Sequence, residues 1–359
     1  MKFSSILFLN SMELDFLQEI VFSGLYKRLG KRITEYPAKK NYYISMGYPN
    51  DISYVQKSHN SANFVSSVFG KHDIIILGSC KAETLKYYYR LLLISSNIRK
   101  MPAILIDGGD SIEVGGDAPE YFKKICNIRE FDCIFKREMK HENINHKVFS
   151  LSLGVNIDAY ARYLNSVKDY DICYAARATN NIREEVYGIL KNMCLKKSVI
   201  NLEKNKAVHN THRTGLRKWF QKRANQIKKI VGIKKYNSYL DFNSLSLPPS
   251  QYLDMLGKSR VGISLPGAGF DTFRYWEIPA LGALLFSLVP NIYVRDNFID
   301  EENAIFFKSI NEIAPKLKKL LQNKERIRDL AERGFEHVRK YHTDIHRADF
   351  VLNTIDKLT

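Results

Sequence analysis

Apolar residues in the first half of the chain follow two alternating patterns. Short runs that are almost wholly apolar alternate with longer stretches in which apolar residues recur every three or four positions. The short runs, which predict buried strands, are residues 6–10, 74–77, 103–106 and 132–135. The longer stretches, which predict amphipathic helices, are residues 12–29, 82–99 and 119–125. Such alternation is typical of a parallel sheet with helices packed on it.

The same alternation restarts after a linker at residues 151–168. It predicts strands at 172–175 and 199–202, a helix from Ile182, and helices over 310–359. The predicted fold class is therefore α/β, with two doubly wound, Rossmann-like domains that face a cleft. The predicted domains are residues 1–165 and 166–340, followed by a C-terminal helix at 341–359. Domains of this kind bind ligands at the carboxyl ends of their strands.

Residues 260–287 carry the most informative motif. A strand at 261–265 runs into a turn punctuated by Pro266, Gly267 and Gly269, and Asp271 or Thr272 can cap the helix that follows. Arg274 and Glu277 then lie three residues apart on one helix face, near the end whose free N–H groups favour an anion. A guanidinium there can hold a diphosphate, and a carboxylate one turn later can accept ribose hydroxyls.

Other interpretations of this motif stay open. An Arg and a Glu three apart are most often a solvated surface pair. The turn lacks the third glycine of a dinucleotide fingerprint, because Thr272 occupies that position, and no G-K-[ST] of a Walker loop occurs in the chain. Pro279 should kink or shorten the last turn of the helix.

Several stretches resemble glycosyltransferases of the GT-B fold that use nucleotide sugars, especially the group-1-like bacterial enzymes of surface polysaccharide synthesis. The matching stretches are FRYWEIPALGALLF, EENAIFF, and ERGFEHV with the later YHT and HRA, all from Tyr252 onward. LSLGVNIDAY (151–160) resembles the interdomain linker of that family, and DICYAARATNNIREEV (171–186) resembles the first strand and helix of its second domain.

The resemblance implies roles for particular residues. The second domain would bind the donor through Arg274, Glu277, Arg177, Gly267, Gly269 and Thr272. The first domain would bind the acceptor, and the C-terminal helix would cross back to it. Many family members have a further glutamate eight residues before the ribose glutamate, but Gly269 stands there, so the group that contacts the sugar and the anomeric outcome stay open.

Candidate catalytic carboxylates follow the strand at 103–106. Asp107 and Asp110 flank two glycines, a geometry that can aim a carboxylate into the cleft as general base for an acceptor hydroxyl, with Asp110 preferred. The alternative is an Asp-Gly turn whose side chains cap it. Lys136 and Arg137 also end a strand and could neutralise phosphate, or could be solvated charges.

Composition fits a two-domain enzyme without a bound metal. The chain has 359 residues, 45% of them hydrophobic, and five cysteines without C-x-x-C spacing. No apolar run is long enough to span a membrane, and the start resembles a buried strand more than a signal peptide, so we expect a cytoplasmic protein. The D-x-D at 169–171 precedes a strand, and His342 and His346, four apart on an expected helix, lack a third ligand. We expect no tightly bound cofactor, with the nucleotide sugar as co-substrate.

The net charge of +17 has its densest source in a basic insertion at 204–236. Within residues 213–235, Trp219 and Phe220 fall on an apolar stripe flanked by Lys and Arg, which predicts either peripheral contact with an anionic membrane or a solvated insertion. The predicted function is transfer of a hexose-type sugar from a nucleotide sugar to a glycan or lipid-linked glycan. The alternatives are a sugar-nucleotide epimerase of the GT-B type and a basic nucleic-acid-binding protein, for which no recognition motif occurs.

Overall fold

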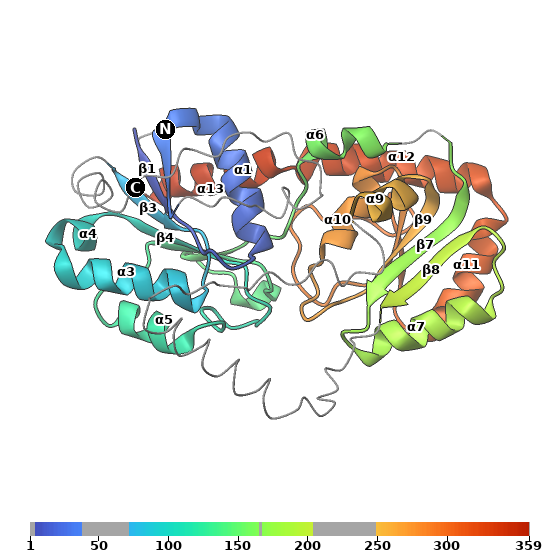
Figure 1. Ribbon diagram of the computed structural model, residues 1–359, viewed down its shortest axis with the longest axis horizontal. Helices are drawn as coiled ribbons and strands as arrows, with labels where there is room; N and C mark the ends of the chain where they lie inside the picture. The colour runs from blue at the N-terminus through green and yellow to red at the C-terminus, as the bar shows by residue number, and fades with distance from the viewer. Residues whose placement is uncertain (1–3, 38–71, 165–166, 204–248, 359) are drawn as a thin grey trace, which may run out of the picture.

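The computed structural model describes residues 4–37, 72–164, 167–203 and 249–358. The basic insertion, including 213–235, lies outside the described residues. Within the described residues no helix combines the length and the apolar character needed to cross a membrane. The described chain forms two parallel-sheet α/β domains, so the predicted fold class is confirmed (Figure 1).

The first domain contains a six-stranded sheet in the order β2-β1-β3-β4-β5-β6, with every pairing parallel. Its strands are β1 (Ile6–Leu9), β2 (Ile33–Tyr36), β3 (Ile74–Leu77), β4 (Ala103–Asp107), β5 (Cys133–Lys136) and β6 (Val148–Ser150). Its helices are α1 (Phe16–Leu29), α3 (Ala82–Ile94), α4 (Ser96–Lys100) and α5 (Pro119–Cys126). The expected single helix over 82–99 is wrong in one respect: it breaks at Ser95, whose hydroxyl accepts a hydrogen bond from the N–H of Ile98 and starts α4.

Alternate residues of the buried strands pack on opposite faces of this sheet. In β1, Leu7 and Leu9 belong to the apolar cluster that α3, α4 and α5 complete. Ile6 and Phe8 belong to a second cluster that includes residues of α1 and of α13 (Asp344–Leu358). Side chains alternate between the faces of a strand, so a wholly apolar run requires helices on both faces. Figure 1 shows α13 beside α1 on the first domain, where the two helices pack together.

The second domain contains a five-stranded sheet in the order β11-β10-β9-β7-β8, also wholly parallel. Its strands are β7 (Tyr170–Arg177), β8 (Ser198–Glu203), β9 (Ser259–Ser264), β10 (Leu284–Leu288) and β11 (Ile305–Phe307). Its helices are α7 (Asn181–Asn192), α9 (Pro249–Gly257), α10 (Phe273–Ala280), α11 (Ile313–Leu321) and α12 (Lys324–Tyr341). The short helix α6 (Ile157–Tyr160) lies in the segment that joins the domains.

The two sheets share one apolar core across the domain boundary. Trp276 of α10 and Val338 of α12 belong to the same cluster as Phe8 and Val21 of the first domain. Residues Leu151, Leu153 and Val155 connect the two parts of this cluster. The domains are therefore packed against each other close to the carboxyl ends of β5 and β9, where loop residues from both sheets meet.

Candidate functional site

The loop at residues 265–272, between β9 and α10, forms the centre of the candidate site. Two side chains of the α7 start hold it. Asn180 Nδ2 donates hydrogen bonds to the carbonyls of Pro266 (3.1 Å) and Gly267 (3.0 Å). Arg183 Nε donates to Pro266 O (2.8 Å) and its Nη2 to Leu265 O (3.2 Å). Asn180 also caps α7 by accepting from the N–H of Arg183, so one helix start fixes the path of the loop.

Arg274 adds a positive charge to this edge of the sheet. It lies in the first turn of α10, is half-buried, and its Nε has no hydrogen-bond partner among the described residues. The pKa of Arg183 falls to about 10, chiefly because burial disfavours its charge and secondarily because of the positive charge of Arg274. Two guanidinium groups therefore act on each other beside a helix N-terminus, an arrangement suited to an anionic ligand.

Glu277 lies one turn along α10 and is enclosed by tyrosines. The residue is 1% exposed, so the surface-pair interpretation is wrong for it. Tyr160 donates its hydroxyl to Glu277 Oε1 at 3.0 Å, and Tyr252 donates to Oε2 at 3.3 Å. Burial raises the pKa of Glu277 to about 7, against the opposing effects of Tyr160, Arg274 and Tyr252. Each oxygen of this carboxylate therefore accepts one tyrosine hydroxyl.

Asp271 links the loop to the first domain. Its carboxylate accepts hydrogen bonds from the backbone N–H of Leu153 at 2.6 Å and from Trp276 Nε1 at 2.6 Å. Burial raises the pKa of Asp271. Thr272 is the N-cap residue of α10, but its side chain makes no capping hydrogen bond; its hydroxyl lies 3.5 Å from Ser264 Oγ.

Arg137 and Glu138, which follow β5, meet the same loop from the first domain. Arg137 Nη1 donates to the carbonyl of Asp271 at 3.3 Å, and Nη2 pairs with Asp110. Glu138 Oε1 accepts from the N–H of Asp271 at 2.8 Å, and burial raises the pKa of this glutamate. A Cβ at Gly269 would lie 2.4 Å from Glu138 Oε1 and 2.8 Å from Asp110 Oδ1. Two candidates from the sequence, Gly269 and Asp110, are thus neighbours across the domain boundary.

Asp107 and Asp110 occupy different environments. Asp107 is 0% exposed, and its Oδ1 accepts from Cys80 Sγ, the Gly109 N–H and Lys136 Nζ at 2.8, 3.0 and 3.1 Å. Its Oδ2 accepts from the Gly115 N–H at 2.8 Å. Asp107 therefore shapes the loop that carries Asp110, and its geometry does not present a base to an acceptor. Lys136 faces this interior carboxylate instead of a phosphate. The Asp110 side chain, in contrast, is 53% exposed.

Arg177 ends β7, where the sequence resemblance implied a cation for the diphosphate. Its Nε lies 3.4 Å from Glu203 Oε2 on the neighbouring strand β8. Its carbonyl accepts from Arg183 Nη1 at 3.1 Å, which joins the end of β7 to the guanidinium that holds the loop. Gly267 lies close to the same guanidinium: a Cβ there would be 3.2 Å from Arg183 Nη2.

Sequence reasoning missed Asn180, Arg183, Glu138, Tyr160 and Tyr252. An Asn directly before a predicted helix was an available signal for Asn180; the others lack a local signal. The expectation that His342 and His346 share a helix is wrong, because α12 ends at Tyr341 and His346 belongs to α13. Across the described ranges, no group of three His, Cys, Asp or Glu residues could hold a metal ion.

Comparison with known proteins bears on the fold. Residues 213–353 match the family described as "Glycosyl transferase-like". No curated protein matches the chain. Among solved structures, HepE from Anabaena in complex with UDP and glucose is 10% identical with a TM-score of 0.60, over 99% of this chain and 100% of that one.

Two further structures share the fold over the full length. An alpha-glucosyltransferase in complex with UDP-glucose and DNA containing an abasic site is 13% identical, with a TM-score of 0.60 over 99% of this chain and 98% of that chain. Sucrose-phosphate synthase from Thermosynechococcus elongatus is 11% identical, with a TM-score of 0.56 over 99% of both chains. At these identities the likeness shows the fold, which is GT-B.

Proposed function

We propose that this chain, which has the GT-B fold and matches the family described as "Glycosyl transferase-like" over residues 213–353, is a glycosyltransferase. In this proposal it transfers a hexose-type sugar from a nucleotide-sugar donor to a glycan or lipid-linked glycan acceptor in surface polysaccharide synthesis. One observation carries the proposal. Arg274 and Arg183 concentrate positive charge beside the loop 265–272, and the buried Nε of Arg274 has no hydrogen-bond partner in the described part of the chain. A nucleoside diphosphate would supply negative charge and hydrogen-bond acceptors to Arg274.

The donor is bound by groups at the carboxyl edge of the second sheet. Arg274 and the first N–H groups of α10 stabilise the diphosphate, which gains negative charge as it leaves the sugar. Glu277 accepts the ribose hydroxyls by exchanging one of its tyrosine partners. Gly267, Gly269 and Thr272 shape the wall of this site, and Arg177 adds a cation at the end of β7. HepE and the alpha-glucosyltransferase, which share the fold, were both solved with UDP or UDP-glucose, which supports a nucleotide sugar as donor.

The acceptor approaches from the first domain, where Asp110 is exposed next to Gly269. Asp110 takes the proton of the acceptor hydroxyl as the new bond to the anomeric carbon forms and the bond to the diphosphate breaks. Arg137, paired with Asp110 and bonded to the Asp271 carbonyl, fixes the carboxylate relative to the donor loop. Proton transfer requires such positioning within hydrogen-bond reach.

A lipid-linked acceptor would bring the protein to a membrane surface. Segment 213–235, outside the described residues, has the composition for peripheral contact with anionic lipid through Trp219 and Phe220. Binding to anionic vesicles that weakens with salt, with a blue shift of Trp219 fluorescence, is the expected result at the inner face of the membrane. If Trp219 fluorescence did not change when vesicles were added, segment 213–235 would be interpreted as a solvated insertion.

The decisive experiment combines donor screening with product analysis. A ligand at about 100 times its Kd adds about 2.7 kcal/mol to the free energy of unfolding, so a panel of UDP-, GDP-, ADP- and dTDP-sugars can be ranked by thermal shift. The best donor is then incubated with and without acceptor glycans. Transfer predicts a glycosylated product that requires acceptor, whereas an altered sugar nucleotide formed without acceptor would establish the epimerase. Absence of any nucleotide-sugar shift, with tight heparin and DNA binding, would favour the nucleic-acid alternative.

A further inference from the structure

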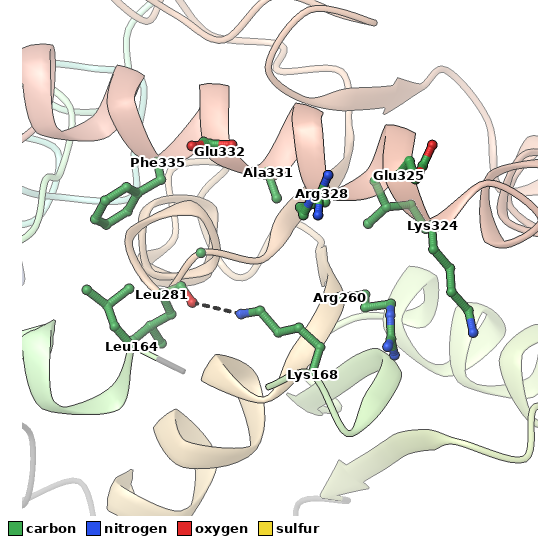
Figure 2. A pocket seen from close by; sticks show the side chains of 12 residues that line it. Leu164, Lys168, Arg260, Leu281, Lys324, Glu325, Arg328, Ala331, Glu332 and Phe335 are labelled. Carbon is green, nitrogen blue, oxygen red and sulfur yellow. Dashed lines mark hydrogen bonds between the residues drawn. The ribbon is translucent and has the colours of Figure 1, made fainter. Parts of the chain in front are cut away.

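A pocket lies at the amino-terminal edge of the second sheet, opposite loop 265–272. It has a volume of about 900 Å³. Its walls come from α12, from Arg260 at the start of β9, from Leu281 and Gly282 before β10, and from Leu164 and Lys168 before β7 (Figure 2). Because loop 265–272 follows the carboxyl end of β9, the sheet separates this pocket from the candidate donor site.

One face of α12 supplies most of the polar wall. Lys324, Arg328 and Glu332 follow at intervals of four residues, and Phe335 continues the same face. Residues spaced this way lie above one another on a helix. The buried residues Ile327 and Ala331, between them, form part of the floor. The helical spacing therefore places all of these side chains on the side of α12 that lines the pocket. The cations Lys324 and Arg328 lie near the start of the helix, and the Phe335 ring lies further along it.

Positive charge exceeds negative charge in this lining. Four cations, Lys168, Arg260, Lys324 and Arg328, are opposed by two carboxylates, Glu325 and Glu332. Arg260 Nη1 lies 3.1 Å from Asp171 Oδ1, which partly neutralises it. Lys324 and Arg328 have neither an ion pair nor a side-chain hydrogen bond within the ranges described. Like charges four residues apart on a helix repel each other, so these two cations favour an anion between them.

Lys168 contributes a partly buried ammonium group to the pocket wall. Its Nζ donates to the carbonyls of Gly257 at 2.6 Å and Leu281 at 3.3 Å. Burial, and next the positive charge of Arg260, lower the pKa of this lysine to about 8. The two carbonyls hold the ammonium in place but do not neutralise it.

Apolar and charged side chains are partly separated within the pocket, although the Lys168 ammonium lies 3.3 Å from the Leu281 carbonyl at the apolar end. In Figure 2, Leu164, Leu281 and Phe335 gather at one end, whereas Arg260, Arg328 and Lys324 lie toward the other. A ligand matching both ends must carry negative charge at one end and apolar surface at the other. The volume lies within the range of pockets that enclose small organic ligands.

We propose that this pocket binds an amphipathic phosphate, with its phosphate between Lys324, Arg328 and Arg260 and its apolar body against Leu164, Leu281 and Phe335. The ligand is a phosphate monoester on an alkyl or aryl body. This site is separate from the donor site and does not depend on the function proposed for it.

Calorimetry on the full-length protein tests the proposal with four probes: n-octyl phosphate below its micellar concentration, phenyl phosphate, inorganic phosphate and n-octanol. We expect octyl or phenyl phosphate to bind at least tenfold more tightly than inorganic phosphate or octanol. Saturating UDP should leave this binding unchanged. Displacement by UDP would place the probe in the donor site and overturn the proposal, as would equal binding of inorganic phosphate.

Variants assign the binding to the pocket. The double substitution Lys324→Gln with Arg328→Gln should weaken octyl phosphate at least tenfold, and Phe335→Ala should weaken it while leaving inorganic phosphate unchanged. Arg333→Gln is the matched control, because Arg333 lies on α12 outside the lining and pairs with Asp329 at 2.9 Å. Wild-type affinity in the double variant, with an unchanged melting temperature, would overturn the assignment.

Discussion

Glu138 of the first domain accepts a hydrogen bond at 2.8 Å from the backbone N–H of Asp271 in the second domain, 133 residues further along the chain. This contact places a buried carboxylate against the loop that precedes α10. Only a residue without a side chain fits beside it, and Gly269 occupies that place. At this point of the domain boundary, the contact is between a backbone N–H and a carboxylate, and it lies between the proposed donor and acceptor groups.

Gly269→Ala should damage this contact. Its Cβ would lie 2.4 Å from Glu138 Oε1 and 2.8 Å from Asp110 Oδ1, so the loop or both carboxylates must move. We expect a loss of about 1 to 3 kcal/mol in the free energy of unfolding together with reduced turnover. Gly188→Ala is the matched control, because nothing lies within 4 Å of its Cβ in helix α7. That variant should gain up to about 1 kcal/mol. Equal stability of the two variants in urea unfolding would contradict the close approach at Gly269.

Arg274→Ala should weaken nucleotide binding without harming the fold. The variant loses charge-assisted hydrogen bonds to the diphosphate, so we expect binding of UDP to weaken by about 2 to 3 kcal/mol. It also removes a charge that repels Arg183 and attracts Glu277; because these two effects oppose each other, the unliganded protein should stay close to wild type in stability. Titration calorimetry measures the first effect and thermal unfolding the second. Arg333→Ala, on the surface of α12, is the control. Unchanged UDP affinity in Arg274→Ala would remove Arg274 from the donor site.

Local patterns predicted most of the fold. The buried strands β1, β3, β4 and β5 were found because continuous apolar runs require cover on both faces of a sheet. Strands β2 and β6 were missed: each is only three or four residues long, lies at a sheet edge, and mixes apolar with polar residues. Short edge strands carry too little apolar periodicity to stand out from loops.

The partners of the candidate site follow from tertiary structure and could not be predicted by spacing. The glycines and the proline predicted the loop at 265–272, and the helical spacing predicted that Arg274 and Glu277 lie on one helix face. Of the two tyrosines that bind Glu277, Tyr160 is 117 residues away, and Glu138 is similarly distant from Asp271. The sequence also placed Asp107 and Asp110 together at the end of one strand. It could not show that Lys136 and two backbone N–H groups bind the carboxylate of Asp107.

Glu277→Gln should change how stability depends on pH. The folded-state pKa of Glu277 is about 7, above a value of about 4.3 in an unfolded chain. The folded protein therefore retains a proton that the unfolded chain has lost, and its free energy of unfolding falls as pH rises from about 4.3 to about 7. At about 1.4 kcal/mol per pH unit, the full loss for this group alone is about 4 kcal/mol, and the dependence vanishes outside that window.

The measurement is urea unfolding of wild type and Glu277→Gln at several pH values between 4.5 and 8. We expect the stability of the variant relative to wild type to rise by about 3 kcal/mol across this window. Glu332→Gln, an exposed substitution on α12, provides the control and should show no such trend. If the free energy of unfolding of wild type and of the variant differed by the same amount at every pH, Glu277 would not bind its proton more tightly in the folded state.

Asp110→Asn tests the proposed general base. The amide preserves shape and can still accept a hydrogen bond from Arg137, but it cannot take the proton of an acceptor hydroxyl. We expect turnover to fall by about 10² to 10⁴ while the Kd for the donor stays unchanged. Asp117→Asn is the matched control, since Asp117 lies on the same loop and pairs with Lys81 at 2.8 Å. If Asp110 served only to position Arg137, the variant would keep the pH profile of kcat and lose activity through a higher KM. A fall in kcat with the donor Kd and the KM unchanged is the result that identifies Asp110 as the base.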